Sequence, residues 1–115
     1  MSAHVRRERG CEISVSGTLI GTATLFDADP SMGVAMGILE PSSAYQPEVF
    51  AHEAGNGRTL VKSDSMASIV AGSDRLELTY FLQDYAAALP DEVARQVTVF
   101  FRDWETYEGF FDRSL

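Results

Sequence analysis

The sequence predicts an α+β domain that is rich in β-strands, in which an antiparallel sheet forms a small roll or a partly open barrel with one or two short helices. Three observations lead to this fold class. Short runs of alternating apolar and polar residues recur along the chain, Gly, Pro, Asp and Ser separate them, and few helical patterns lie between them. A chain of 115 residues, 45% of them hydrophobic, suffices for one buried core.

The first two strands are predicted over residues 11–15 and 18–26, joined through Ser16-Gly17 as a hairpin. A strict two-residue loop places Ile13 opposite Ile20. A bulge at Gly17 shifts that pairing by one residue, and both registers stay open.

A turn at residues 27–30, which end in a proline, precedes a third strand over residues 32–39. One face of this strand carries Ala35, Gly37 and Leu39, so that face is small. Glycine within or beside a strand marks a bulge or the close approach of another backbone or a ligand. We therefore consider a ligand pocket here and, as the alternative, a bend in a curved sheet. The candidate pocket residues are Gly33, Gly37, Asp27, Asp29 and His52.

A short helix is expected to start at Ser43 or nearer Gln46, because Pro47 disfavours the earlier start, and to stop at Gly55. Residues 85–89 favour helix until Pro90 interrupts them. Asp103 can cap a final helix in which aromatic residues recur at helical spacing. Between these helices, strands are expected over residues 58–62, 66–70, 75–82 and 97–101.

The charge is strongly negative, with 9 Lys and Arg against 17 Asp and Glu, a net charge of -8. Three arginines lie within residues 1–10, which we expect to be a flexible basic arm ahead of a single domain over residues 11–115. The acidic domain repels phosphate backbones and anionic lipids, so we expect no nucleic-acid and no membrane partner. The acidity favours a basic protein partner, although it also serves solubility.

The chain contains no apolar run long enough to span a membrane and no apolar signal-peptide core behind its basic start, so we expect a cytoplasmic protein. The single cysteine, Cys11, cannot form an internal disulfide. It lies on the apolar side of the first predicted strand, where we expect a buried and unreactive thiol.

Motifs for chemistry are missing from the sequence. His4, His52 and Cys11 are too few for a zinc site, and Asn56 stands where a zinc-protease motif starting at His52 needs its second histidine. We therefore predict no catalytic residue, no metal and no cofactor, and expect His52 at a solvated helix end. The acidic pairs Asp27/Asp29 and Asp103/Glu105 suit a turn and a helix start.

Four aromatic residues lie close together near the C-terminus: Trp104, Tyr107, Phe110 and Phe111. Aromatic side chains anchor protein interfaces, so these residues form a candidate interface. The alternative is that they close one end of the sheet and belong to the core.

The segment of residues 29–37, with the pattern D-P-x-M-G-V-A-x-G, followed by Pro41 and Tyr45, resembles a stretch found in a family of small uncharacterised bacterial proteins. Members also pair an early hairpin with a late strand and an aromatic tail, here residues 97–111. The resemblance implies a bacterial cytosolic protein and brings no activity and no catalytic residue.

From these observations we expect a noncatalytic, acidic protein-interaction module that forms a homodimer or binds a basic protein partner. The alternative function is a small-molecule-binding or weakly catalytic β-domain with a pocket near Gly33 and Gly37.

Overall fold

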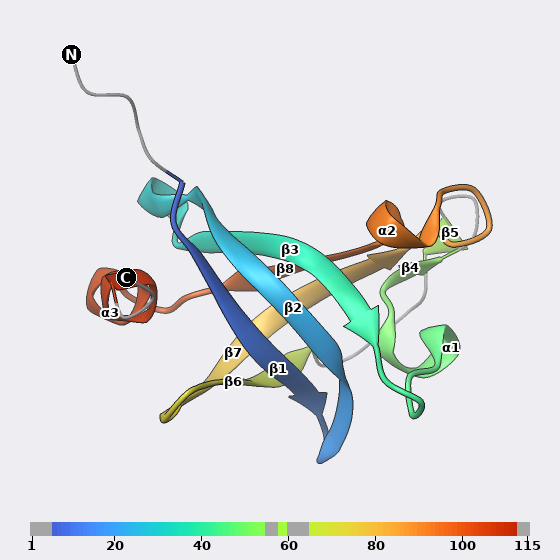
Figure 1. The fold of residues 1–115 in the computed structure, drawn as a ribbon, viewed down its shortest axis with the longest axis horizontal. Coiled ribbons are helices and arrows are strands. Elements are labelled where there is room, and N and C mark those ends of the chain that lie inside the picture. The colour runs from blue at the N-terminus through green and yellow to red at the C-terminus, as the bar shows by residue number, and fades with distance from the viewer. Residues whose placement is uncertain (1–5, 55–57, 60–64, 113–115) are drawn as a thin grey trace.

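The computed structural model describes residues 6–54, 58–59 and 65–112 (Figure 1). Within these residues, eight strands, three short helices and one 3-10 turn, η1, follow one another. In order they are β1 (Glu8–Val15), β2 (Thr18–Asp29), η1 (Pro30–Met32), β3 (Val34–Pro41), α1 (Pro47–Phe50), β4 (Glu53–Ala54), β5 (Arg58–Thr59), β6 (Met66–Ala71), β7 (Asp74–Asp84), α2 (Asp91–Ala94), β8 (Arg95–Phe100) and α3 (Trp104–Asp112).

Two antiparallel three-stranded meanders, β1–β2–β3 and β6–β7–β8, build the domain. β1 pairs with β6 and β3 pairs with β8, both antiparallel, so the sheet closes into a six-stranded barrel. β4 and β5 continue the sheet outside the barrel, where β4 lies parallel to β7. The predicted β-rich α+β class is confirmed, and the barrel is closed.

The first hairpin has the shifted register. Its turn residues Ser16 and Gly17 both have positive φ, as a type I′ turn requires, and Val15 pairs directly with Thr18. Ser14 then pairs with Leu19, but Ile13 pairs with Gly21, because Ile20 is an extra residue on β2. The bulge thus lies at Ile20 and not at Gly17, and it lets both isoleucines bury completely in the core.

The small face of β3 points into the barrel, as its alternation predicts. A Cβ on Gly37 would collide with the backbone oxygen of Thr24 on β2. Gly33 has φ +68, and a Cβ there would lie 3.1 Å from the backbone oxygen of Phe101. Both glycines therefore admit neighbouring backbone, which corresponds to the curved-sheet alternative.

The core fills the barrel with the inward-facing residues of all six strands. Its completely buried side chains include Ile13, Ile20, Leu25, Ile69, Leu82, Val97 and Val99. Cys11 is also buried, as expected, and burial raises the pKa of its thiol to about 12.

The helices differ from the sequence prediction in detail. α1 starts at Pro47 with Gln46 as its N-cap, which is the later of the two expected starts, and ends at Phe50. The expected stop at Gly55 lies outside the described residues. The prediction of a helix over residues 85–89 is wrong, because that segment forms turns. The single-turn helix α2 follows Pro90 instead. Proline suits a helix start and not its interior.

Three strand boundaries also differ. β2 runs to Asp29, so the turn begins at Pro30, later than predicted. β5 covers residues 58–59, and the rest of the strand expected to reach residue 62 lies outside the described residues. β1 already begins at Glu8, so residues 8–10 belong to the barrel and not to a flexible arm. Residues 1–5 of that arm lie outside the described residues.

None of the helices in the described part of the chain is long and apolar enough to cross a membrane.

Candidate interaction surfaces

The C-terminal aromatics divide into core and surface. Tyr107, Phe110 and Phe111 are buried in α3 and close one end of the barrel, whereas Trp104 is 58% exposed. The three buried rings pack with Phe101 at centroid distances of 5.0–6.3 Å. Of the four candidate interface residues, the structure therefore leaves only Trp104 on the surface.

Two arginines of the N-terminal segment hold α3 against the barrel. Arg7 binds Glu108 through both terminal nitrogens, at 3.0 and 2.9 Å, and its Nε lies 3.0 Å from the buried Asp27 carboxylate. Arg9 donates to the carbonyl of Phe110 at 2.9 Å and lies over its ring. Asp27 and Asp29 therefore do not act together in one turn, because Asp27 binds Arg7.

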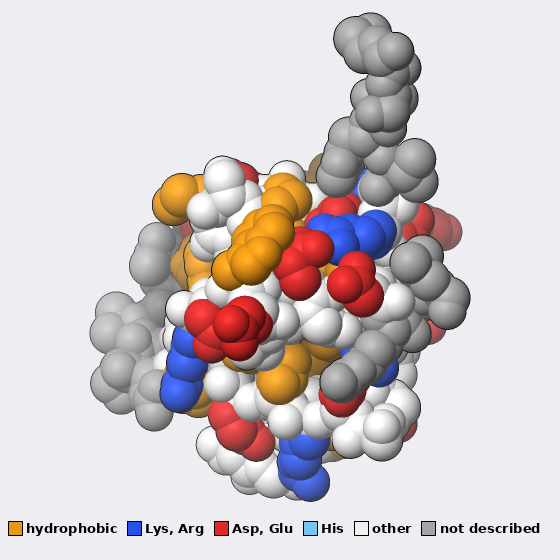
Figure 2. All heavy atoms as spheres, turned by 90° about the vertical axis from the view of Figure 1, so that its left-hand side faces the viewer, with side chains coloured by type: hydrophobic (Ala, Val, Ile, Leu, Met, Phe, Trp, Pro, Cys, Tyr) orange, Lys and Arg blue, Asp and Glu red, His pale blue; other side chains and the backbone are white. Residues whose placement is uncertain are grey.

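Three exposed apolar side chains lie at this same end of the barrel, and we call them the apolar platform: Met32, Phe100 and Trp104. They are 71%, 40% and 58% exposed. Phe100 pairs across the strands with Val34, and the amide of Phe101 donates to the carbonyl of Gly33 at 2.8 Å, so the segments 32–34 and 100–101 run side by side. Figure 2 looks at this end and shows exposed hydrophobic side chains with both acidic and basic side chains around them.

Carboxylates stand beside the apolar platform. Asp29 caps η1 by accepting from the amide of Met32 at 3.3 Å, and Asp103 caps α3 by accepting from the amide of Thr106 at 2.8 Å. The hydrogen bond from the Thr106 backbone lowers the pKa of Asp103, so this carboxylate stays ionised. Glu105 is exposed in the first turn of α3, and Arg102 is an exposed cation nearby in the chain.

The candidate pocket residues do not converge on one cavity mouth. Gly33 and Gly37 face neighbouring backbone, and Asp27 is buried against Arg7. Asp29 caps η1, which precedes β3. His52 lies between α1 and β4, at the opposite end of the barrel from α3 (Figure 1).

His52 is buried, which corrects the expectation of a solvated helix end. The amide of Leu82 donates to its Nδ1 at 3.0 Å, so the ring proton sits on Nε2, which faces the hydroxyl of Ser65 at 2.5 Å. A serine protease needs the reverse arrangement, with Nε2 free to accept the serine proton. His52 therefore links Leu82 of β7 to Ser65, the residue before β6, and its Nε2 is not free to accept the serine proton.

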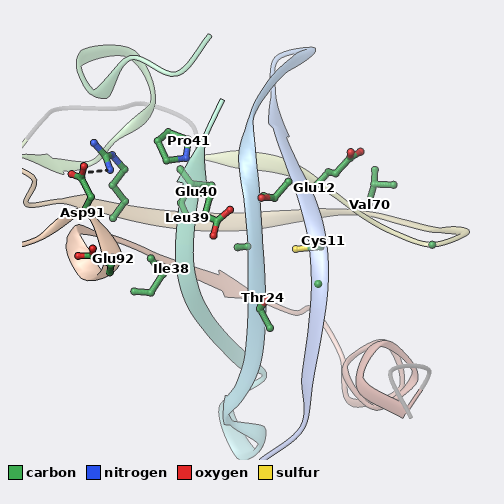
Figure 3. Close-up of a pocket in the computed structure, with 15 residues that line it drawn as sticks. Cys11, Glu12, Thr24, Ile38, Leu39, Glu40, Pro41, Val70, Asp91 and Glu92 are labelled. Atoms are coloured by element: carbon green, nitrogen blue, oxygen red, sulfur yellow. Dashed lines mark ion pairs between the residues drawn. The ribbon is translucent and has the colours of Figure 1, made fainter. Parts of the chain in front are cut away.

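An acidic groove of about 950 Å³ crosses the outer face of β1, β2 and β3 (Figure 3). Its floor carries small residues, Gly10, Thr22 and Thr24, which leave the sheet surface open. Glu12 pairs across the strands with Thr22, and Thr22 pairs with Glu40, so the two glutamates flank one threonine. α2 forms one side of the groove.

Four carboxylates line this groove: those of Glu12, Glu40, Asp91 and Glu92. Asp91 lies 3.7 Å from Arg95, which is also paired with the buried Asp84 at 3.4 Å. Within the described part of the chain, Glu12, Glu40 and Glu92 form no ion pair. The groove therefore presents a negative potential toward solvent.

Sequence reasoning missed this groove. Alternation does place Glu12, Thr22 and Glu40 on the solvent side of their strands, but bringing them into one row requires the register of three strands. No group of His, Cys, Asp and Glu among the described residues is arranged to hold a metal ion. Comparisons with protein-family models, curated proteins and solved structures found no match to the chain.

Proposed function

We propose that this protein is a noncatalytic interaction module that binds a basic segment of a partner protein in the acidic groove. The observation that carries the proposal is the row Glu12–Thr22–Glu40, in which two carboxylates without ion pairs flank a floor of small side chains. Lysine or arginine side chains laid over this floor would meet both carboxylates, and complementary charge speeds encounter and selects the partner.

A partner of opposite charge fits better than a second copy of this chain. Two copies would each bring a net charge of -8 and would repel each other. Each of the six barrel strands already pairs with a neighbour on both sides, and the edge strand outside the barrel, β5, has only two described residues, which leaves little sheet edge for dimerisation. A lone, buried thiol suits a reducing compartment, so we propose that the interaction takes place in the bacterial cytoplasm.

The groove is tested with a fluorophore-labelled peptide of alternating arginine and serine, followed by fluorescence anisotropy. We expect binding that weakens as salt is added, and no binding of an alternating glutamate and serine peptide. The double variant Glu12→Gln/Glu40→Gln should weaken binding about three- to tenfold, since an exposed ion pair contributes roughly 0.2–1 kcal/mol.

The matched control is Glu48→Gln/Glu77→Gln, which changes the net charge equally at two exposed residues outside the groove. Equal weakening in both double variants would show that only net charge attracts the peptide, and it would refute the groove as the binding site. Native mass spectrometry adds a check on the partner, because a stable homodimer contradicts the preference for a basic partner over a second copy.

A further inference from the structure

We infer that the apolar platform is a second docking surface, separate from the acidic groove, for a partner segment that carries an apolar anchor residue beside lysine or arginine. It lies at the end of the barrel that α3 closes, whereas the groove lies on the outer face of β1–β2–β3 (Figures 1 and 3). The inference does not depend on the groove being occupied.

Trp104 is exposed, but it has a neighbouring ring in its own helix. Its ring stacks on Tyr107 at a centroid distance of 6.3 Å and an interplanar angle of 16°. Tyr107 is itself buried, and its hydroxyl donates to the carbonyl of Val34 at 3.0 Å. The Asp103 cap fixes the start of the helix. A tryptophan already ordered in the free protein loses little side-chain entropy on binding, which is the property of an interface hot spot.

The neighbouring apolar residues come from ordered backbone as well. Met32 sits at the end of η1, where Asp29 accepts from its amide and Gly33 closes the turn on Pro30. Phe100 ends β8 beside Val34. Single exposed apolar residues are common on protein surfaces, but here three come from adjoining segments at one end of the barrel, and exposed apolar side chains grouped in this way mark interaction sites.

The charge around the patch selects the occupant. Three exposed carboxylates, those of Asp29, Asp103 and Glu105, come from the same segments as the platform, which contribute one exposed cation, Arg102. Two other arginines at this end already have acidic partners, since Arg6 is paired with Glu8 and Arg7 with Asp27, Glu108 and Asp112. A second copy would bring the same carboxylates to the contact and be repelled. A segment that pairs a leucine-like anchor with lysines gains both apolar burial and charge complementarity.

Trp104 is the only tryptophan of the chain, so fluorescence excited selectively at tryptophan, and not at the four tyrosines, reports on the platform alone. The probe is a soluble peptide made of the repeat Lys-Lys-Leu, without aromatic residues. We expect it to shift the Trp104 emission to shorter wavelength and to reduce quenching by acrylamide. Peptides of the repeats Lys-Lys-Ser and Glu-Glu-Leu should leave the emission unchanged, because each lacks one of the two required features.

Two sets of variants separate the platform from the groove. Asp103→Asn/Glu105→Gln should weaken the Lys-Lys-Leu response about threefold or more, while asparagine still caps the helix. Met32→Ala should weaken it too. The groove variant Glu12→Gln/Glu40→Gln should leave it unaltered, so failure of this inference and failure of the proposed function are distinguishable. Circular dichroism confirms that each variant is folded.

Three outcomes would overturn the inference. One is an unchanged Trp104 emission with Lys-Lys-Leu at saturating concentration. Another is an equal response to a control peptide. An equal response to Lys-Lys-Ser would show that charge alone causes binding, and an equal response to Glu-Glu-Leu would show that apolar contact alone causes it. The third is an emission shift that appears when the protein alone is concentrated, since this would assign the platform to a second copy of the chain.

Discussion

The two ends of the barrel are closed by different kinds of interaction. At the α3 end, three buried aromatic rings fill the opening, and the arginines that hold the helix lie around them. At the opposite end, beside α1 and α2, buried polar groups cross-link the elements: Tyr45 donates to Asp84 at 2.7 Å, and Asp84 is paired with Arg95. His52 and Tyr80 add two further hydrogen bonds to backbone atoms there.

This difference should decide which substitutions each end of the barrel tolerates. Apolar packing is non-directional, so the α3 end should accept residues of similar volume. Hydrogen bonds between buried groups require particular partners. Removing one group at the other end therefore leaves a buried neighbour without its hydrogen-bond partner. We therefore expect conservative substitutions to be mild at the α3 end and costly at the polar end.

The largest effect is expected for Phe111→Ala, because the ring of Phe111 is completely buried between α3 and the barrel. Deleting a buried ring costs about 3–5 kcal/mol of the free energy of unfolding, which urea denaturation measures. Phe111→Leu should cost much less, since it retains most of the apolar volume. Similar losses for both variants would show that this end depends on a specific ring geometry and not on apolar filling.

At the polar end, Asp84→Ala should cost about 3 kcal/mol, because the largely buried charge of Arg95 then keeps only the exposed Asp91, at 3.7 Å, as its partner. Tyr45→Phe removes one hydrogen bond to the same carboxylate and should cost about 1 kcal/mol. Urea denaturation of both variants gives the comparison. If Asp84→Ala is no worse than Tyr45→Phe, the ion pair contributes little and the proposed contrast between the ends fails.

Between the ends, Gly37→Ala should cost about 1–3 kcal/mol, because its Cβ would press on the Thr24 backbone and separate β2 from β3. Gly10→Ala is the matched control on β1, where a Cβ meets no atom within 4 Å. Thermal unfolding of the two variants should differ clearly in midpoint. Equal midpoints would indicate that β2 and β3 can move apart without cost.

The smallest effect is a dependence on pH at the α3 end. Hydrogen bonds from Arg7 lower the pKa of Glu108 below its ordinary value of 4.5. A lowered carboxylate pKa stabilises the fold above the unfolded pKa, and this contribution is lost as the pH falls through the folded pKa. Asp103 follows the same sign, because its pKa is also lowered.

Glu108→Gln tests this dependence. The variant should be less stable than the natural chain at neutral pH, and the difference should shrink as the pH falls below about 4.5, when Glu108 of the natural chain is protonated as well. Amide exchange of α3 measured across this range follows the effect locally. A difference that stays constant with pH would show that the glutamine acts through packing and not through lost charge.

The sequence predicted the aromatic end better than the polar one, for a physical reason. Alternation and helical spacing are local properties, so residues 11–15, 75–82 and 104–111 could be assigned to elements, and the core role of most aromatics could be weighed. The hydrogen-bond partners of His52 and Asp84 are distant in the chain, and no local sequence pattern predicts them. His52 was accordingly expected in solvent.

The acidic groove depends on one extra residue. Without the bulge at Ile20, Glu12 would face Gly21, and the row Glu12–Thr22–Glu40 would not form. The sequence permits either register, because both isoleucines are apolar and the turn suits both. The observed pairing of β2 with both β1 and β3 brings Glu12 and Glu40 to the same threonine.

The two seams of the barrel also shape how the chain folds. Each meander consists of neighbours in sequence and can form from short loops, but the β1–β6 and β3–β8 seams join strands that lie more than 50 residues apart. Closing such long loops is entropically costly and slow, so the seams should form last. The β1–β6 seam pairs only Glu12, Ile13 and Ser14, and we expect its amides to be the first of the barrel to exchange with solvent.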